Sequence, residues 1–189
     1  MRAGREALDK EITLSATKQG QRRLNRPARG LCVLRTEVFV PKPIQEVFAF
    51  FSDARNLERL TPPWVGFRIL TPTPIEMRAG ALIDYRIRVR GVPLRWRTAI
   101  TVWEPPFRFV DLQLRGPYVW WHHEHRFEAE AGGTRVMDTV EYKAPLAWLS
   151  HPLLVSRDVS RIFAYRSELL PRLIGPSPAP AHSPSTSGV

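Results

Sequence analysis

Six short segments rich in β-branched and aromatic residues follow one another between positions 67 and 143. Glycine or proline punctuates them at Gly80, Gly91, Pro105, Gly116 and Gly132. Such short, regular spacing is typical of hairpins in an antiparallel meander. The pattern therefore predicts six consecutive antiparallel strands, at residues 67–70, 81–90, 94–104, 108–114, 119–129 and 134–143.

Alternation within these segments predicts a sheet with one wet face and one covered face. Ile83, Tyr85 and Ile87 alternate with charged residues, and so do the apolar positions of several other segments. In the third segment, the phase opposite Trp96 is expected to face solvent. That phase comprises Arg95, Arg97, Ala99, Thr101 and Trp103.

The elements that flank the meander are a further strand and three helices. Residues 32–40 read as a strand that Pro41 ends, and the apolar residues from Ile44 to Phe51 then fall on one helical face. A second short helix is expected through Leu57 and Leu60. A stripe of apolar residues with helical spacing predicts a long helix over about 153–174, frayed near Pro171. The fold class is therefore α+β, with a seven-stranded curved antiparallel sheet wrapped around a long C-terminal helix.

Both ends of the 189-residue chain differ in composition from its middle. Residues 1–29 are basic with little apolar periodicity, residues 175–189 are low in complexity, and we expect both to be disordered around one domain at 30–174. The basic arm is either a solvated leader or a contact with an acidic partner or a membrane. The chain has one cysteine, no signal-peptide pattern and no apolar run of about 20 residues, which favours the cytoplasm. Half of the net charge of +10 comes from the first 30 residues, and a high pI alone is poor evidence for a nucleic-acid partner, so none is expected.

Several runs resemble the SRPBCC superfamily, which includes START-like, Bet v 1-like, polyketide cyclase/dehydrase and coenzyme-Q-binding proteins. The resemblance rests on residues 37–41 (Glu-Val-Phe-Val-Pro), 56–64 (Asn-Leu-Glu-Arg-Leu-Thr-Pro-Pro-Trp), 121–127 (Trp-His-His-Glu-His-Arg-Phe) and 133–136 (Gly-Thr-Arg-Val). It covers roughly residues 33–174 and implies a helix-grip fold. Members share this shape far more than they share a ligand.

A curved sheet that a single helix cannot fill along its whole length favours an internal cavity. Aromatic residues occur at many of the positions that strand parity or helical phase turns inward, as expected for a site that holds an apolar ligand. The alternative is that most of them simply pack the core, and we expect about half to do so. The predicted lining is Trp64, Tyr85, Trp96, Phe109, Trp121, His123, His125, Val140, Tyr142 and Phe163.

The histidines of the 121–127 run are the main polar candidates. On a strand, His123 and His125 share a face with Phe127, whereas His122 and Glu124 point the other way. Two histidines at this spacing can ligate a metal, but the sequence shows no clear third ligand, so no metal or other cofactor is predicted. A wall that orients a ligand carbonyl or hydroxyl is favoured over a metal site, and the alternative to both is that these are hydrogen-bonded strand histidines with no ligand role.

Two aspartates share strand parity with inward-facing neighbours. Asp111 lies two residues after Phe109, and Asp138 lies two residues before Val140. An inward Asp138 beside His123 and His125 could serve as acid/base machinery for cyclisation or dehydration. The alternative is that Asp138 pairs with an arginine of a neighbouring strand. A basic strip on adjacent strands is either a solvated face or a patch for a membrane or acidic partner, and consists of Arg86, Arg88, Arg90, Arg95, Arg97 and Arg115.

The favoured function is non-catalytic binding or transport of a small apolar molecule such as a lipid, quinone or polyketide. The first rival is a polyketide cyclase or dehydratase that uses the cavity histidines and aspartate. The second is an interaction protein that docks through its basic arm. The sequence does not name the ligand, decide whether catalysis occurs or give the oligomeric state.

Overall fold

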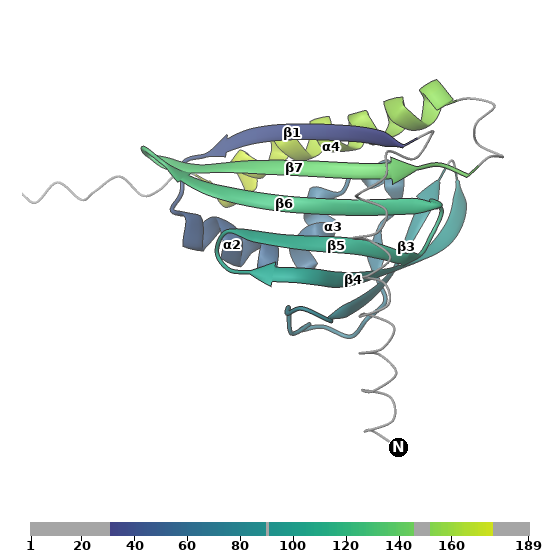
Figure 1. Ribbon diagram of the computed structural model, residues 1–189, viewed down its shortest axis with the longest axis horizontal. Coiled ribbons are helices and arrows are strands. Elements are labelled where there is room, and N and C mark those ends of the chain that lie inside the picture. Colours follow the sequence, from purple (N-terminus) through teal and green to yellow (C-terminus); the bar gives the residue numbers. More distant parts are fainter. Residues whose placement is uncertain (1–30, 90, 146–151, 176–189) are drawn as a thin grey trace, which may run out of the picture.

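The computed structural model describes residues 31–89, 91–145 and 152–175. Seven strands form one antiparallel sheet in the order β1-β7-β6-β5-β4-β3-β2, so the first strand pairs with the last (Figure 1). The predicted seven-stranded sheet is thereby confirmed. The strands are β1 (Cys32–Val40), β2 (Arg68–Ile69), β3 (Leu82–Val89), β4 (Val92–Glu104), β5 (Arg108–Arg115), β6 (Trp120–Glu130) and β7 (Gly133–Lys143).

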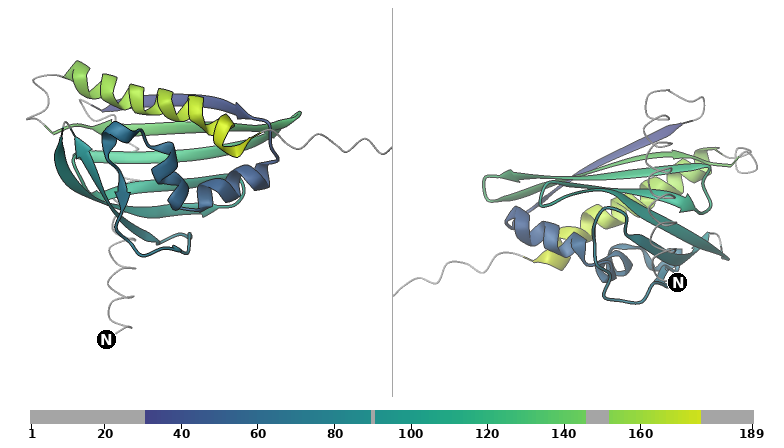
Figure 2. Two further views of the ribbon diagram at one scale, coloured as in Figure 1. Left: turned by 180° about the vertical axis from the view of Figure 1, so that it is seen from behind. Right: turned by 60° about the horizontal axis from the view of Figure 1, so that its bottom comes forward.

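The helices all lie on the concave face of this sheet (Figure 2). The 23-residue helix α4 (Pro152–Ile174) crosses it, and α2 (Ile44–Ser52) and α3 (Arg55–Leu60) lie below α4 with the short 3₁₀ helix η1 (Pro63–Val65). This arrangement confirms the predicted helix-grip fold. None of the helices in the described ranges is long and apolar enough to cross a membrane.

The larger hydrophobic cluster extends from α2 to residues of β3 and β4 such as Tyr85 and Trp96. Phe48 and Phe51 of α2 pack edge-to-face on Phe127 of β6, with ring centroids 5.3 and 5.0 Å apart. Phe127 is 2% exposed. A second, smaller cluster lies where α4 covers β1 and β7, and it includes Val140 and Val159. Residues of both clusters, such as Trp96 and Phe163, also line the cavity described below.

The third predicted strand departs from strict alternation. The β4–β5 register shifts between Ile100 and Val102, as at a β-bulge, which inverts the side-chain parity beyond it. Trp103 therefore points inward and packs on Phe48, with ring centroids 5.0 Å apart. Ala99 precedes the shift and keeps its outward parity, yet it is fully buried. The expectation that both residues face solvent was wrong, although Arg95 and Arg97 are exposed as expected.

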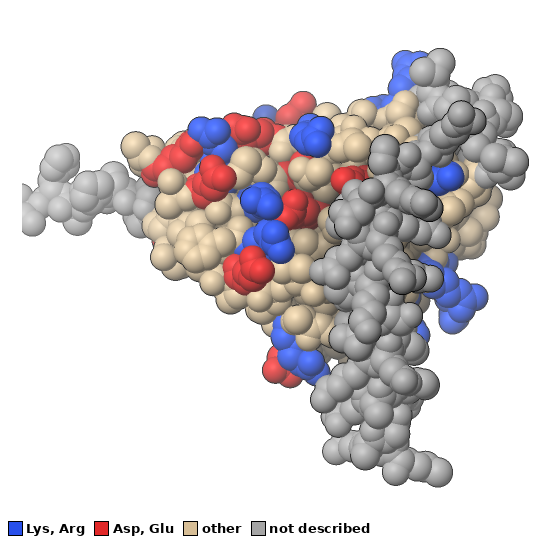
Figure 3. All heavy atoms as spheres, viewed as in Figure 1, with Lys and Arg blue, Asp and Glu red and all other residues tan. Residues whose placement is uncertain are grey.

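The convex face of the sheet carries charges of both signs in close proximity (Figure 3). Arg97 of β4 makes a two-pronged ion pair with Asp84, its register partner on β3, at 2.8 and 2.7 Å. Arg108 contacts Glu104 at 3.2 Å and Glu124 at 3.3 Å. One arginine of the expected basic strip, Arg97, is thus paired with a carboxylate.

Several sequence expectations fall on residues outside the described ranges. The basic arm at 1–29 and most of the tail at 175–189 belong to this group, and so does Arg90.

Candidate functional site

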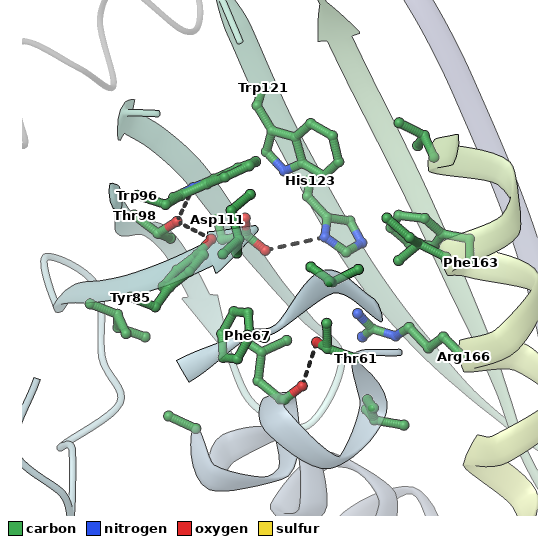
Figure 4. A pocket seen from close by; sticks show the side chains of 18 of the residues that line it. Thr61, Phe67, Tyr85, Trp96, Thr98, Asp111, Trp121, His123, Phe163 and Arg166 are labelled. Carbon is green, nitrogen blue, oxygen red and sulfur yellow. Dashed lines mark hydrogen bonds and ion pairs between the residues drawn. The ribbon is translucent and has the colours of Figure 1, made fainter. Parts of the chain in front are cut away.

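A cavity of about 850 Å³ lies between the concave face of the sheet and helices α3 and α4 (Figure 4). Eight of the ten residues expected to line it do so: Trp64, Tyr85, Trp96, Phe109, Trp121, His123, His125 and Phe163. The volume falls within the range of sites that hold small molecules.

The two remaining expected residues, Val140 and Tyr142, lie elsewhere. Both are buried in the small cluster beneath α4, in which Val140 is fully buried and Tyr142 is 4% exposed. Strand parity turns them toward the concave face as expected, but α4 contacts the sheet directly over this edge and leaves no free volume there. Parity predicted their face correctly, while the cavity depends on how far the helix stands from the sheet.

One wall of the cavity is a continuous aromatic surface with an internal hydrogen-bond network. Tyr85 and Trp96, which are register partners on β3 and β4, stack at 5.6 Å, and Trp121 meets Trp96 edge-on at 5.2 Å. The Thr98 hydroxyl accepts a hydrogen bond from Trp96 Nε1 at 3.0 Å and pairs with the Tyr85 hydroxyl at 3.0 Å. The polar ends of these rings are therefore paired within the wall, which leaves a largely apolar surface facing the cavity.

Trp64 marks the place where the cavity opens. It lines the cavity and is nevertheless 56% exposed. Its ring packs edge-on against Tyr165 of α4 at 5.4 Å, and the Arg161 guanidinium lies 5.7 Å from its centroid. The opening thus combines an exposed aromatic side chain with a positive charge.

A cluster of two histidines and two aspartates adjoins the aromatic wall on the same face of the sheet, and its His123 lies two residues beyond Trp121 on β6 (Figure 4). Register sets it: Asp111 of β5 is directly opposite His123 of β6, and His125 of β6 is directly opposite Asp138 of β7. Directly opposed residues of antiparallel strands have side chains close enough to interact. Because His123 and His125 are two residues apart, their side chains share one face and their rings lie 3.7 Å apart.

Each histidine contacts both aspartates. His123 Nδ1 is 3.3 Å from Asp111 Oδ2, and His123 Nε2 is 3.0 Å from Asp138 Oδ1. His125 Nε2 is 3.0 Å from Asp111 Oδ2, and His125 Nδ1 is 2.8 Å from Asp138 Oδ1. The two rings therefore lie between two carboxylates, and both histidines are at least 95% buried.

Arg166 of α4 completes the cluster and points toward it from the helix (Figure 4). It is 7% exposed, and its Nε lies 3.7 Å from Asp138 Oδ2. Its guanidinium also lies 5.2 Å from the centroid of Phe51. The sequence interpretation that paired Asp138 with an arginine of a neighbouring strand was wrong about the source of the arginine, because Arg166 belongs to helix α4.

The neighbouring charges determine the pKa of each group in the cluster. Burial alone would raise the pKa of Asp138, but Arg166 and the two histidines hold it well below its usual value. Burial would also raise the pKa of Asp111, and His123 and His125 hold it below the usual value. Burial alone would lower the pKa of His123, but the two carboxylates raise this pKa above its usual value. For His125, burial and the charge of His123 lower the pKa. Of the two histidines, His123 is therefore the one that more readily binds a proton and becomes positively charged.

Sequence reasoning missed the role of Arg166 and gave Asp111 too little weight. Arg166 continues the helical spacing of Ile162 and Phe163, so a charged residue on an otherwise apolar stripe was a readable signal. Asp111 has inward parity, but its approach to His123 depends on the β5–β6 register. This register is set by turn geometry that the sequence does not fix.

The arrangement is capable of three kinds of chemistry. All four ring nitrogens face carboxylates, so a ligand oxygen would bind here by replacing one of these contacts, of which His123 Nδ1–Asp111 Oδ2 at 3.3 Å is the longest. The paired titratable groups can also transfer protons. The ligand atoms of Asp111, His123 and His125 all lie within 4.8 Å of one another, so these three residues can also hold a metal ion. All three line the cavity, whereas Asp138 lies behind the histidines and does not.

The comparisons agree with this description of fold and cavity. A family model described as "Polyketide cyclase / dehydrase and lipid transport" matches residues 40–162. A search of curated protein sequences finds no significant relative.

Several solved structures share the fold. A Thermus thermophilus protein aligns with a TM-score of 0.62 at 18% identity, covering 76% of this chain and 97% of that one. The Zhui aromatase/cyclase from a Streptomyces species aligns with a TM-score of 0.61 at 16% identity, and the alignment covers 76% of this chain and 93% of that one. A START superfamily protein from Mycobacterium smegmatis aligns with a TM-score of 0.56 at 10% identity, and the alignment covers 75% of this chain and 98% of that one. At these identities the likeness concerns the fold alone.

Proposed function

Because the chain belongs to the polyketide cyclase/dehydrase and lipid transport family, we propose that its cavity binds a small, mostly apolar molecule that carries one oxygen-bearing group. A lipid, a quinone and a polyketide all have this character. The observation that carries the proposal is the division of the cavity into an aromatic wall and one polar cluster. An apolar body fits against Trp96 and Trp121, and a carbonyl or hydroxyl of the ligand fits against His123 and His125. The cytoplasm is the proposed location.

Adjacent tryptophans provide a matched test of this proposal. Trp121 lines the cavity, whereas Trp120 points to the opposite face of the sheet and packs with Leu112. If the ring covers about 60 Å² of apolar ligand surface, its loss costs about 1.5 kcal/mol, or roughly tenfold in Kd. In a fluorescence titration with the neutral apolar probe N-phenylnaphthylamine, Trp121→Ala should weaken binding about tenfold, and Trp120→Ala should change it less than about twofold. Equal affinities of both variants would contradict the cavity as the binding site.

A second candidate function is favoured by the histidine–aspartate contacts. A pure carrier needs only an apolar wall with an orienting group, whereas here two histidines and two carboxylates meet within hydrogen-bond reach beside the cavity. This geometry suits acid/base catalysis of a cyclisation or dehydration. The test is product formation from a linear poly-β-ketone. An enzyme should lose product in His125→Gln or Asp138→Asn while N-phenylnaphthylamine still binds, and a carrier should form no product in any variant.

A further inference from the structure

We propose that Asp111, His123 and His125 form a site for a divalent first-row transition-metal ion on the wall of the cavity. The proposal does not depend on the identity of the apolar ligand. It rests on the contacts of the described residues, one step at a time.

The first step is the donor set. His123 Nδ1 and His125 Nε2 both approach Asp111 Oδ2, at 3.3 and 3.0 Å. Metal bonds of about 2.0–2.1 Å to imidazole and carboxylate ligands place adjacent donors about 2.9–3.4 Å apart, from octahedral to tetrahedral geometry. Both observed separations fall within this range. The three ligand atoms lie within 4.8 Å of one another, so an ion can bind all three once the imidazole rings adjust their positions.

The second step is the outer support of the ligands. The ring nitrogens that face away from Asp111 are His123 Nε2 and His125 Nδ1, and both contact Asp138 Oδ1, at 3.0 and 2.8 Å. A histidine that ligates a metal almost always donates its other ring N–H to such an acceptor, which fixes the tautomer and the orientation of the ring. Asp138 is held in turn by Arg166 at 3.7 Å. A single buried carboxylate thus contacts both imidazoles on the side away from Asp111, and Arg166 Nη2 also lies 3.4 Å from His125 Nδ1.

The third step is charge. The cluster contains two carboxylates, Asp111 and Asp138, and one permanently charged cation, Arg166. Buried charges that are not balanced are costly, so this cluster favours an additional cation. A proton on a histidine supplies one positive charge and makes the cluster neutral. A divalent ion in place of that proton bonds to all three donors and leaves the cluster with one excess positive charge.

The donor types narrow the class of ion. Two imidazoles and one carboxylate suit zinc, iron(II), cobalt(II) and nickel(II), in contrast to the all-oxygen sites of calcium and magnesium. Three protein ligands leave at least one coordination position open, which is typical of reactive sites and not of structural ones. The three residues line the cavity, so the open position is available to an oxygen of the bound molecule.

The test uses the full chain, treated with a chelator and then titrated with Co²⁺ alone, because its visible absorption reports on the ligands. We expect one saturable site. Asp111→Asn and His125→Gln should each weaken binding by at least tenfold, and Asp138→Asn should weaken it by about 10- to 100-fold through loss of outer support. His122→Gln is the matched control: this histidine of the same strand faces outward and stacks on Trp120, so its loss should leave Co²⁺ affinity unchanged.

Thermal unfolding of each variant in the absence of metal shows whether it still folds. X-ray absorption at the cobalt edge of the wild-type protein gives a measurement that needs no variant, and two imidazole ligands are expected in the first shell. The absence of a saturable Co²⁺ spectrum would overturn the proposal. So would equal affinity in His125→Gln and the wild type, or a loss of affinity in His122→Gln alone.

Discussion

Replacement of Arg166 by Met removes the one positive charge that α4 brings to the histidine–aspartate cluster, while it keeps most of the apolar stem. Removing one partner of a buried ion pair typically costs about 3–5 kcal/mol, because the other charge stays buried. The 3.7 Å separation from Asp138 is long, and His125 still contacts that carboxylate, so we take the lower end, about 3 kcal/mol. The lost contact of the guanidinium with Phe51 adds about 0.5 kcal/mol.

Urea unfolding followed by tryptophan fluorescence measures this change, since the chain has six tryptophans. A loss of about 3 kcal/mol should also lower Tm by on the order of 10 °C for a domain of this size. Arg161→Met is the matched control on the same helix. Arg161 is exposed beside Trp64, so its loss should change the free energy of unfolding by less than about 0.5 kcal/mol.

A double-mutant cycle with Asp138→Asn separates the ion pair from the packing of the arginine stem. If the two residues are coupled as described, the second substitution should cost much less in the Arg166→Met background than in the wild type. Arg166→Met with a free energy of unfolding within about 0.5 kcal/mol of the wild type would refute the reasoning, since a buried carboxylate cannot lose its counter-ion at no cost.

Three further predictions concern the scaffold. Phe127→Ala should cost about 3–5 kcal/mol because the ring is 2% exposed, whereas Phe107→Ala, with 62% exposure, should cost less than about 0.5 kcal/mol; chemical denaturation compares the two. The partner Arg97 lowers the pKa of Asp84, so Asp84→Asn should cost about 0.5 kcal/mol at neutral pH after allowance for solvent screening. The difference in free energy of unfolding between Asp84→Asn and the wild type should fade as pH falls below about 4 and Asp84 becomes protonated at its lowered pKa. A difference that stays constant down to about pH 2 would contradict this. Deletion of residues 1–29 and 175–189 should leave Tm within about 5 °C, and a larger fall would show that an arm packs on the domain.

The fold was largely predictable because its signals are local. Turn residues such as Gly91 and Gly132 mark the ends of strands, and the apolar stripe of α4 is visible at helical spacing. Where the prediction failed, the cause was non-local. The inversion of Trp103 follows from a shift in the β4–β5 register that nothing in the residue pattern announces.

The candidate site was predictable only in part, for a similar reason. Parity correctly placed His123 and His125 on the concave face, and it also placed Asp111 there. What parity cannot give is distance between strands or between a helix and the sheet. The contact of Asp111 with His123 depends on register, and the approach of Arg166 depends on how α4 crosses the sheet. Val140 and Tyr142 were assigned to the cavity because the sequence does not show where the helix closes the gap.

Native mass spectrometry of the full chain, purified from the organism that produces it, tests the central claim most directly. The account predicts a bound molecule whose extra mass disappears on denaturation and is recovered in an organic solvent. Occupancy should fall in Trp121→Ala and persist in Trp120→Ala, because only the first of these rings lines the cavity. A chain of bare mass in every preparation, or a bound molecule that partitions into water and is unaffected by Trp121→Ala, would contradict the proposal of an apolar ligand in this cavity.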